Sequence, residues 1–367
     1  MRIAVFIHGG IGGGKHQQGV PALHYLLQDL AKTHEVAVYN HINTAPLEHD
    51  YALYSAPSWL KQPSLRWLWI AMVFLAHHLK HRHQLLHGFW AIPGGRFAHL
   101  MSKIVRRPLV ITFMGGESAN LPDIPYGFLS SPKTKDTLKK LSLAADAVVL
   151  LSEHAKTNLL AAGIQFRTQQ IIQFGIPTEL FSYEPNTIRP PYKFVNVGNI
   201  HPTKDPMTLI EGFALFLEEN EAHLTIIGGD WWEGKVQERA QTLGISSHVS
   251  FLGEIPYPEV AKNIRDSDAM LHSSRHEGQG MIFLEAMASG TLIISTPVGI
   301  AAELGGTVVA NFPPQEPIAL ARVVKEVMED AERRTRMLKS GKEWADKHTI
   351  PAATSSYVEL YQTILER

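Results

Sequence analysis

The sequence predicts an α/β protein made of two doubly wound domains with parallel sheets. Short runs rich in β-branched and apolar residues alternate with stretches of helical spacing along nearly the whole chain. The alternation begins at residues 2–7 and begins again at residues 192–198, after the proline-rich segment 184–191. Because proline continues neither a helix nor a central strand, we interpret this segment as a hinge between two βα series.

Each series consists of β-branched runs, which favour strands, and of stretches with apolar residues three and four apart, which favour helices. The first series has expected strands at residues 2–7, 35–39, near 85, at 109–113 and at 147–151, and expected helices at 20–31 and 153–162. The second has expected strands at residues 192–198, 224–227, 249–252, 269–272 and 292–295, and the chain ends in a helix that includes 357–365. We expect a first domain at 1–183 and a second at 184–349, with residues from about 350 to 367 packing back on the first.

Length and composition are those of an ordinary globular protein. The chain has 367 residues, of which 45% are hydrophobic, enough for two cores. It has no cysteine, which excludes disulfide bonds and thiolate metal sites. The N-terminal apolar run is too short for a signal peptide, and no run reaches the ~20 residues that cross a bilayer. We therefore expect a soluble protein of the cytoplasm, or one at the inner face of the membrane.

The charge is distributed unevenly. Residues 1–175 hold 17 lysines and arginines against 9 acids, and the remaining residues hold 17 against 26. The first half also carries 13 of the 19 histidines. A basic half indicates an anionic partner, either a membrane surface or a phosphorylated acceptor. No nucleic-acid-binding motif accompanies the charge, so nucleic acid is not an expected partner.

Segment 273–290 carries the strongest indication of a site. Glu277 stands in a glycine-containing loop, and Glu285 stands inside the following run of helix formers, which ends at Gly290. One carboxylate then precedes a helix and the other projects from its second turn, so both can face one ligand. The free amides of the first turn suit an anion such as a diphosphate. The alternative is a surface helix with an acid near its positive end.

A glycine-rich loop, residues 8–15, follows the first expected strand. It is not a nucleotide-binding P-loop, because His16 occupies the position of the required hydroxyl residue. It is not a dinucleotide fingerprint either, since the glycine frame is absent and Asn40 stands near the position of the required acid. What remains is a backbone that can approach a ligand closely, with a merely tight turn as the alternative.

Taken together, these residues resemble the retaining, nucleotide-sugar-dependent glycosyltransferases of the GT-B fold, known as glycosyltransferase family 4. The segment from Glu277 to Gly290 is similar to the family's Glu-x7-Glu motif, and residues 197–204 are similar to the start of its donor domain. The glycine loop and the interdomain segment 174–181 also resemble family segments. The resemblance spans nearly the whole chain and implies two Rossmann-like domains whose parallel sheets face each other across a cleft.

The resemblance implies a role for each matching residue. Glu277, the implied catalytic residue, would contact hydroxyls of the donor sugar, Glu285 would hold the ribose, and Lys204 would neutralise the diphosphate. The other implied donor-binding residues follow Glu277 or belong to the glycine loop: Gly278, Gln279, Gly280, Met281, Ile282, Gly10, Gly12 and Gly13. Fixed positive charge at such positions stabilises a departing diphosphate, so no metal ion or other cofactor is expected.

Two positions depart from the family pattern. Asn199 stands where the family usually has arginine, and Arg275 is a candidate for the missing cation. Met114 stands where the family commonly has histidine, and its thioether cannot bind a sugar hydroxyl as an imidazole does. The acceptor-side candidates are Met114, a nearby acid and two histidines, namely Glu117, His8 and His87. The alternative for each histidine is a structural residue at a strand end, with its ring nitrogens hydrogen-bonded within the protein.

Residues 59–80 form a long apolar segment with tryptophans and cations at its edges. This composition suits an interfacial helix on anionic lipid, and a core helix is the alternative. Nearby, His77, His81 and His83 include one pair four residues apart that could bind zinc. Because no acid or cysteine accompanies them, a solvated helix end is expected instead.

The sequence therefore predicts a retaining glycosyltransferase of the hexosyltransferase type. It would move a sugar from a nucleotide diphosphate sugar to a hydroxyl of a carbohydrate or lipid-linked acceptor, in glycan, polysaccharide or glycolipid synthesis. The alternative is a catalytically silent GT-B protein that binds a nucleotide or glycan as a partner or regulator, which the departures at Met114 and Asn199 favour.

Overall fold

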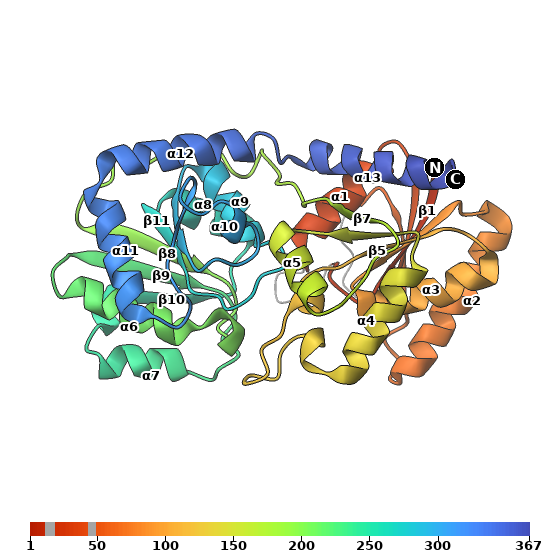
Figure 1. The fold of residues 1–367 in the computed structure, drawn as a ribbon, viewed down its shortest axis with the longest axis horizontal. Helices are drawn as coiled ribbons and strands as arrows, with labels where there is room; N and C mark the ends of the chain where they lie inside the picture. The colour runs from red at the N-terminus through yellow and green to blue at the C-terminus, as the bar shows by residue number, and fades with distance from the viewer. Residues whose placement is uncertain (12–18, 43–48) are drawn as a thin grey trace. The chain divides into compact units, whose positions relative to one another are not determined.

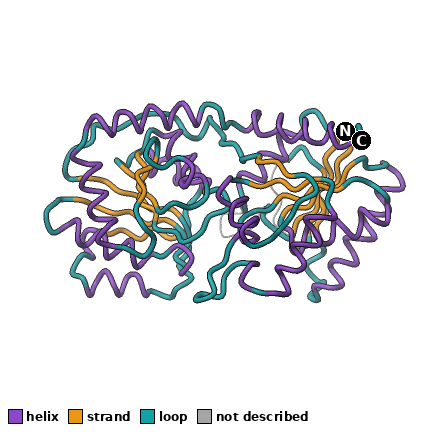
Figure 2. Tube along the Cα trace, in the orientation of Figure 1, coloured by secondary structure: helices purple, strands orange, loops and turns teal. Residues whose placement is uncertain are grey.

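The computed structural model describes residues 1–11, 19–42 and 49–367. The chain divides into two compact units, shown in Figures 1 and 2. The first unit is Met1–Gly175 together with Ile350–Arg367, and the second is Ile176–Thr349. The division after Gly175 falls ahead of the sequence-based boundary after residue 183, and the C-terminal residues belong to the first unit.

The first unit is built on a seven-stranded sheet in the order β3-β2-β1-β4-β5-β6-β7. All of its neighbouring strands pair in parallel. The strands are β1 (Arg2–Ile7), β2 (Glu35–Asn40), β3 (Ala52–Ser55), β4 (Leu85–Phe89), β5 (Leu109–Thr112), β6 (Ala147–Leu150) and β7 (Gln169–Ile171). The central strand β1 is a continuous apolar run, as expected for a parallel strand that is covered on both faces.

Helices cover this sheet on both faces. They are α1 (Pro21–Ala31), α2 (Pro63–His81), α3 (Arg96–Val105), α4 (Pro132–Ala144), α5 (Glu153–Ala161) and α13 (Ile350–Leu365). Ile70 and Phe74 of α2 share one apolar core with Ala98 and Met101 of α3. Helix α13 lies beside α1, as Figure 1 shows.

Buried hydrogen bonds fasten α13 to the sheet. The Tyr361 hydroxyl lies 2.6 Å from Nδ1 of His87, and Nε2 of His87 lies 2.8 Å from the Thr112 hydroxyl. The Thr112 hydroxyl in turn lies 3.2 Å from that of Tyr357. Complete burial lowers the pKa of His87 to about 3, so this imidazole is neutral at physiological pH.

The second unit is built on a six-stranded sheet in the order β10-β9-β8-β11-β12-β13, again with parallel pairing throughout. The strands are β8 (Tyr192–Val197), β9 (Ala222–Ile227), β10 (Val249–Gly253), β11 (Ala269–His272), β12 (Leu292–Ser295) and β13 (Val309–Asn311). The helices are α6 (Pro206–Leu217), α7 (Lys235–Thr242), α8 (Tyr257–Arg265), α9 (Met281–Ser289), α10 (Ile300–Glu303), α11 (Pro317–Glu329) and α12 (Ala331–Ala345).

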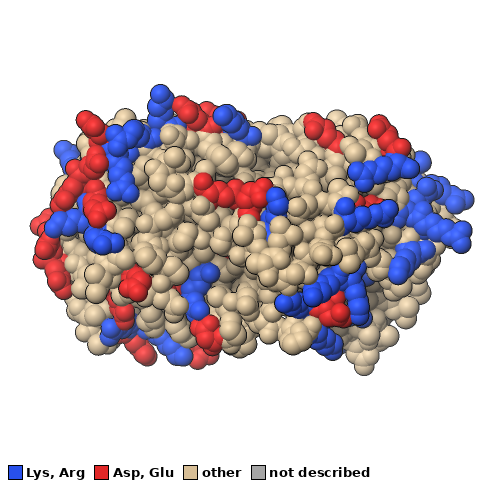
Figure 3. Space-filling model, in the orientation of Figure 1, with Lys and Arg blue, Asp and Glu red and all other residues tan. Residues whose placement is uncertain are grey.

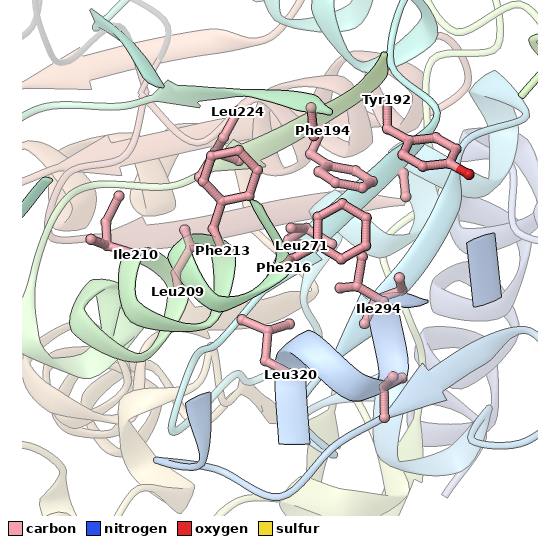
Figure 4. Close-up of a cluster of buried hydrophobic side chains, with 14 of the residues drawn as sticks. Tyr192, Phe194, Leu209, Ile210, Phe213, Phe216, Leu224, Leu271, Ile294 and Leu320 are labelled. Atoms are coloured by element: carbon pink, nitrogen blue, oxygen red, sulfur yellow. The ribbon is translucent and has the colours of Figure 1, made fainter. Parts of the chain in front are cut away.

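An apolar core lies on each face of the second sheet. Figure 4 shows one of these cores, where Phe213 and Phe216 of α6 pack against Phe194 of β8, and Leu320 of α11 belongs to the same cluster. The other core contains most of α9 and the buried side of α8. The predicted fold class, two α/β units with parallel sheets, is confirmed. None of the helices in the described ranges is long and apolar enough to span a membrane.

Candidate functional site

In the second unit, two loops meet at the carboxyl edge of the sheet. One follows β8 and contains the short helix η4 (Pro202–Lys204), and the other follows β11. The Ser273 hydroxyl donates to the carbonyl oxygens of Lys204 at 2.9 Å and of Asp205 at 2.8 Å. The amide of Arg275 donates to the Thr203 carbonyl at 2.8 Å. These bonds fix the Lys204 loop against the segment that carries Glu277.

The Glu277 carboxylate is held from two sides. The Lys204 ammonium donates to its Oε1 at 2.5 Å, and Nε2 of His272 donates to the same oxygen at 2.8 Å. Glu277 is 13% exposed, and His272, the last residue of β11, is almost completely buried. Both bonds end on Oε1, so they orient the carboxylate while its other oxygen takes no part in them.

The contacts among Glu277, Lys204 and His272, which we call the Glu277 triad, determine the protonation states of these side chains. Burial would raise the pKa of Glu277, but the Lys204 ammonium and the His272 hydrogen bond outweigh it and hold the pKa well below its usual range. Burial is the main cause that lowers the pKa of His272, against the opposing effect of Glu277. We therefore expect an ionised Glu277 bound to a neutral imidazole and an ammonium.

Helix α9 begins just after this triad because of its glycines. Gly280 has φ +81°, and a Cβ there would lie 2.4 Å from the Phe283 ring, so the turn into the helix requires glycine. Gly290, with φ +78°, ends the helix in the left-handed conformation typical of a C-terminal glycine. Nearly every residue of α9 is buried, which fixes its position in the unit.

Glu285 lies inside this buried helix. Its side chain is 7% exposed, and the Tyr257 hydroxyl donates to its Oε1 at 2.8 Å. Burial raises the pKa of Glu285 to about 7, although the hydrogen bond from Tyr257 opposes the shift. A buried carboxyl group with a raised pKa costs stability, and such groups concentrate at functional sites.

The residues between Glu277 and α9 form a tightly fixed turn. The Gln279 carbonyl accepts from the amide of Ile300 at 2.9 Å, and a Cβ on Gly299 would lie 2.3 Å from that carbonyl. Gly278 and Gln279 are buried, Ile282 is nearly so, and Met281 is half-buried.

Two further donor-side candidates lie in the second unit: Asn199, which stands where the family usually has arginine, and Arg275, the candidate for the missing cation. The Asn199 side chain accepts a hydrogen bond from the amide of Gly229 at 2.9 Å and so fixes the loop after β9. Arg275 is half-buried, and its amide ties it to the Lys204 loop. That Arg275 replaces the missing cation stays a prediction.

The glycine-loop residues belong to the first unit. Gly10 has φ +91°, and a Cβ on it would lie 2.8 Å from the Trp90 ring, so this position requires glycine. Its carbonyl accepts from the amide of Val20 at 2.6 Å. Gly12 and Gly13 lie outside the described residues.

The acceptor-side candidates have different surroundings. Glu117 is fully buried, and its carboxylate accepts from the amides of Ala91 at 2.7 Å, Met114 at 3.1 Å and Gly115 at 3.0 Å. Burial raises its pKa despite these bonds. Glu117 therefore shapes the loop after β5, in which Met114 is half-buried.

The two histidines differ as well. His87 has both ring nitrogens bonded within the unit, so it is a satisfied residue, but it lies in the middle of β4 rather than at a strand end. His8 is half-buried at the end of β1, where its ring stacks on that of His41 with centroids 4.8 Å apart.

The sequence did not point to His272 or Tyr257. His272 could have been found, because the last residue of a parallel strand faces the carboxyl edge where ligands bind. Tyr257 opens α8 and reaches Glu285 only through the packing of two helices, so no local pattern marks it. Within the described ranges, no group of three or more histidine, cysteine, aspartate or glutamate side chains is arranged to hold a metal ion.

Comparison with known proteins decides the class. Residues 182–344 match the family described as glycosyl transferases group 1. They form a group 1 glycosyltransferase domain. An uncharacterized glycosyltransferase of Methanocaldococcus jannaschii is 24% identical over 76% of this chain and 75% of its own length. A D-inositol 3-phosphate glycosyltransferase of Corynebacterium urealyticum is 27% identical, but over 46% of this chain and 42% of its own length.

Solved structures share the fold over nearly the entire chain. Sucrose-phosphate synthase from Thermosynechococcus elongatus superimposes with a TM-score of 0.83 at 17% identity, covering 100% of this chain and 99% of the other. The Anabaena protein HepE in complex with UDP gives 0.78 at 18% identity, covering 99% and 100%. The predictions of the GT-B fold and of a glycosyltransferase are confirmed, and the silent alternative is not favoured.

Proposed function

We propose that the second unit binds a nucleoside diphosphate sugar at the N-terminus of α9 and that the sugar is transferred with retention of its anomeric configuration. The observation that carries this proposal is the pair of carboxylates, Glu277 before α9 and Glu285 within it. One is held ionised by Lys204 and His272, and the other is buried with a raised pKa. The raised pKa of Glu285 means that its ionisation costs free energy in the folded protein, and a purely structural helix does not need such a buried carboxyl group.

In this proposal each residue has a separate task. The Glu285 carboxylate accepts hydrogen bonds from the ribose hydroxyls, and the second oxygen of Glu277 accepts from a hydroxyl of the donor sugar. Lys204 and the amides at the start of α9 lie next to the leaving diphosphate. Negative charge grows on the diphosphate as the sugar departs, and positive groups that are already in place stabilise it without reorganising. The chain's own cations then do this work without a metal ion.

The acceptor is proposed to be a hydroxyl of a carbohydrate or of a lipid-linked glycan. We place the reaction in the cytoplasm, at the inner face of the membrane where the acceptor is lipid-linked. The excess of lysine and arginine in residues 1–175 supports an acceptor or surface that carries negative charge.

A panel of uridine, guanosine and adenosine diphosphates, each with its sugars, tests donor binding by thermal shift. A ligand that binds the native protein raises its apparent stability in proportion to the logarithm of its concentration over Kd. We expect one base to stand out and its sugar to be transferred or slowly hydrolysed. A protein that no member of the panel stabilises would contradict the proposal.

A further inference from the structure

Helix α2 is apolar on the side that faces away from the core. Ile70, Phe74 and His78 point inward and are buried. Leu65, Leu68, Met72 and Leu79 form a stripe on the opposite side and are between 44% and 72% exposed. A surface helix of a globular protein normally carries polar residues there, and a contiguous exposed apolar stripe indicates a partner.

Helix α3 extends this stripe. The Phe97 ring of α3 lies 4.5 Å from the Trp67 ring of α2, between centroids, and both helices contribute to the same core. Leu100 and Ile104, one helical turn apart on α3, are each more than half exposed. Figure 1 shows the two helices side by side. We call the exposed apolar residues of both helices, Leu65, Leu68, Met72, Leu79, Leu100 and Ile104, the α2–α3 face.

The charge of the segment that carries the α2–α3 face is of one sign. Between residues 51 and 116 the chain has no aspartate or glutamate, and it has eight lysines and arginines. Seven of them are exposed at or near the ends of the two helices: Lys61, Lys80, Arg82, Arg96, Lys103, Arg106 and Arg107. Burial is the main cause that lowers the pKa of His78, and the positive charges of Arg107 and Arg82 lower it further. Both arginines therefore lie near the His78 side chain. In Figure 3 lysine and arginine side chains gather at the right of the view, where Figure 1 draws α2 and α3.

We propose that the α2–α3 face docks on the surface of an anionic lipid bilayer. Its leucines, methionine and isoleucine enter the boundary between headgroups and acyl chains, and the surrounding cations lie at the lipid phosphates. The charge argues against a second copy of this chain, because a two-fold interface would bring the same cations together and residues 51–116 supply no acid to pair them.

Two of the three tryptophans of the apolar segment, Trp67 and Trp69, do not form this surface, whereas Trp59 ahead of α2 is 71% exposed. Trp67 is half-buried and stacks on His41, with centroids 4.4 Å apart, as well as packing on Phe97. Trp69 is also partly buried against the core. A charge at Trp67 would therefore disturb packing, and the informative substitutions lie on the outer stripe.

Vesicle flotation of the full chain tests the proposal. Wild type is expected to bind vesicles that contain phosphatidylglycerol and not vesicles of phosphatidylcholine alone. L68E/M72E should bind at least about tenfold more weakly, since it removes two apolar anchors and adds repelling charge. K103Q and R107Q should each lose roughly fivefold, and binding should weaken with added salt.

Leu79 and Ile318 provide a matched pair, because both are 72% exposed and only Leu79 belongs to the α2–α3 face. L79E should lose vesicle binding, and I318E in the second unit should keep it. Equal binding of L68E/M72E and wild type would overturn the proposal. So would a wild-type dimer that L68E/M72E converts to a monomer in the absence of any vesicle binding. The flotation assay contains no sugar donor or acceptor. Its result therefore does not depend on whether the protein transfers a sugar.

Discussion

Replacement of Glu285 by glutamine should make the protein more stable at alkaline pH. Burial raises the pKa of Glu285 from its ordinary value of 4.5 to about 7. At about 1.4 kcal/mol per unit, ionising this carboxyl group in the folded protein costs at most about 3.5 kcal/mol more than in the unfolded chain. Glutamine occupies nearly the same volume and carries no charge.

The sign follows from the direction of the shift. A group whose pKa is raised by folding contributes stability below its unfolded pKa, and this contribution is lost as the pH rises through the folded pKa. Wild type should therefore lose stability relative to Glu285→Gln between pH 5 and pH 8, by about 2–3 kcal/mol as an upper limit. Because both proteins share every other titrating group, their difference isolates this one.

The assay is thermal unfolding of both proteins at pH 5 and pH 8. At roughly 2–4 °C per kcal/mol for a domain of this size, the advantage of Glu285→Gln should grow by several degrees. Glu259→Gln, at an exposed position on α8, is the control and should show no such growth. If Glu285→Gln differs from wild type by the same amount at both pH values, the carboxyl group is not strained and the reasoning fails.

Two further substitutions test the contacts around each sheet. His272→Leu should lower kcat by roughly 5- to 100-fold, about 1–3 kcal/mol, with a smaller effect on nucleotide affinity, because Glu277 loses one of the bonds that orient it. Steady-state kinetics measure this, His272→Gln should restore part of the rate, and an unchanged kcat would exclude a positioning role. Tyr361→Phe should lower the stability of the first unit by about 1–3 kcal/mol, because it leaves a buried nitrogen of His87 unpaired. Thermal unfolding measures the loss, nucleotide affinity in the second unit should not change, and a wild-type melting curve would contradict the assignment.

The sequence predicted the central strands well because their residues are covered on both faces. In β1, Ile3 to Ile7 form an unbroken apolar run that is fully buried. The strands β3, β7 and β13 were not predicted, since each has only three or four residues and lies at the edge of its sheet. β7 reads Gln169-Gln170-Ile171 and is only half-buried, so tertiary pairing rather than composition makes it a strand.

The site could be predicted only where its residues are continuous in sequence. Glu277, the turn after it and Glu285 lie in one segment, whose glycines and helix formers mark it. The bond between His272 and Glu277 depends on the path of the loop after β11, and the one between Tyr257 and Glu285 on how α8 packs against α9. For Glu117, the sequence indicated a ligand contact, whereas its carboxylate binds backbone amides, including that of Ala91 on another loop. Such partners are set by the fold and leave no local pattern.

The measurement that most directly tests the donor site is a calorimetric titration of wild type and Glu285→Gln with the nucleoside diphosphate that stabilises the protein most. The proposed ribose contact predicts a loss of about 1.5–3 kcal/mol in binding free energy for Glu285→Gln, because a charge-assisted acceptor is removed. It also predicts that wild-type affinity rises with pH through about 7, the pKa of Glu285, and that the variant lacks this rise. Equal affinities of the two proteins across this pH range would contradict the assignment of the nucleotide to α9.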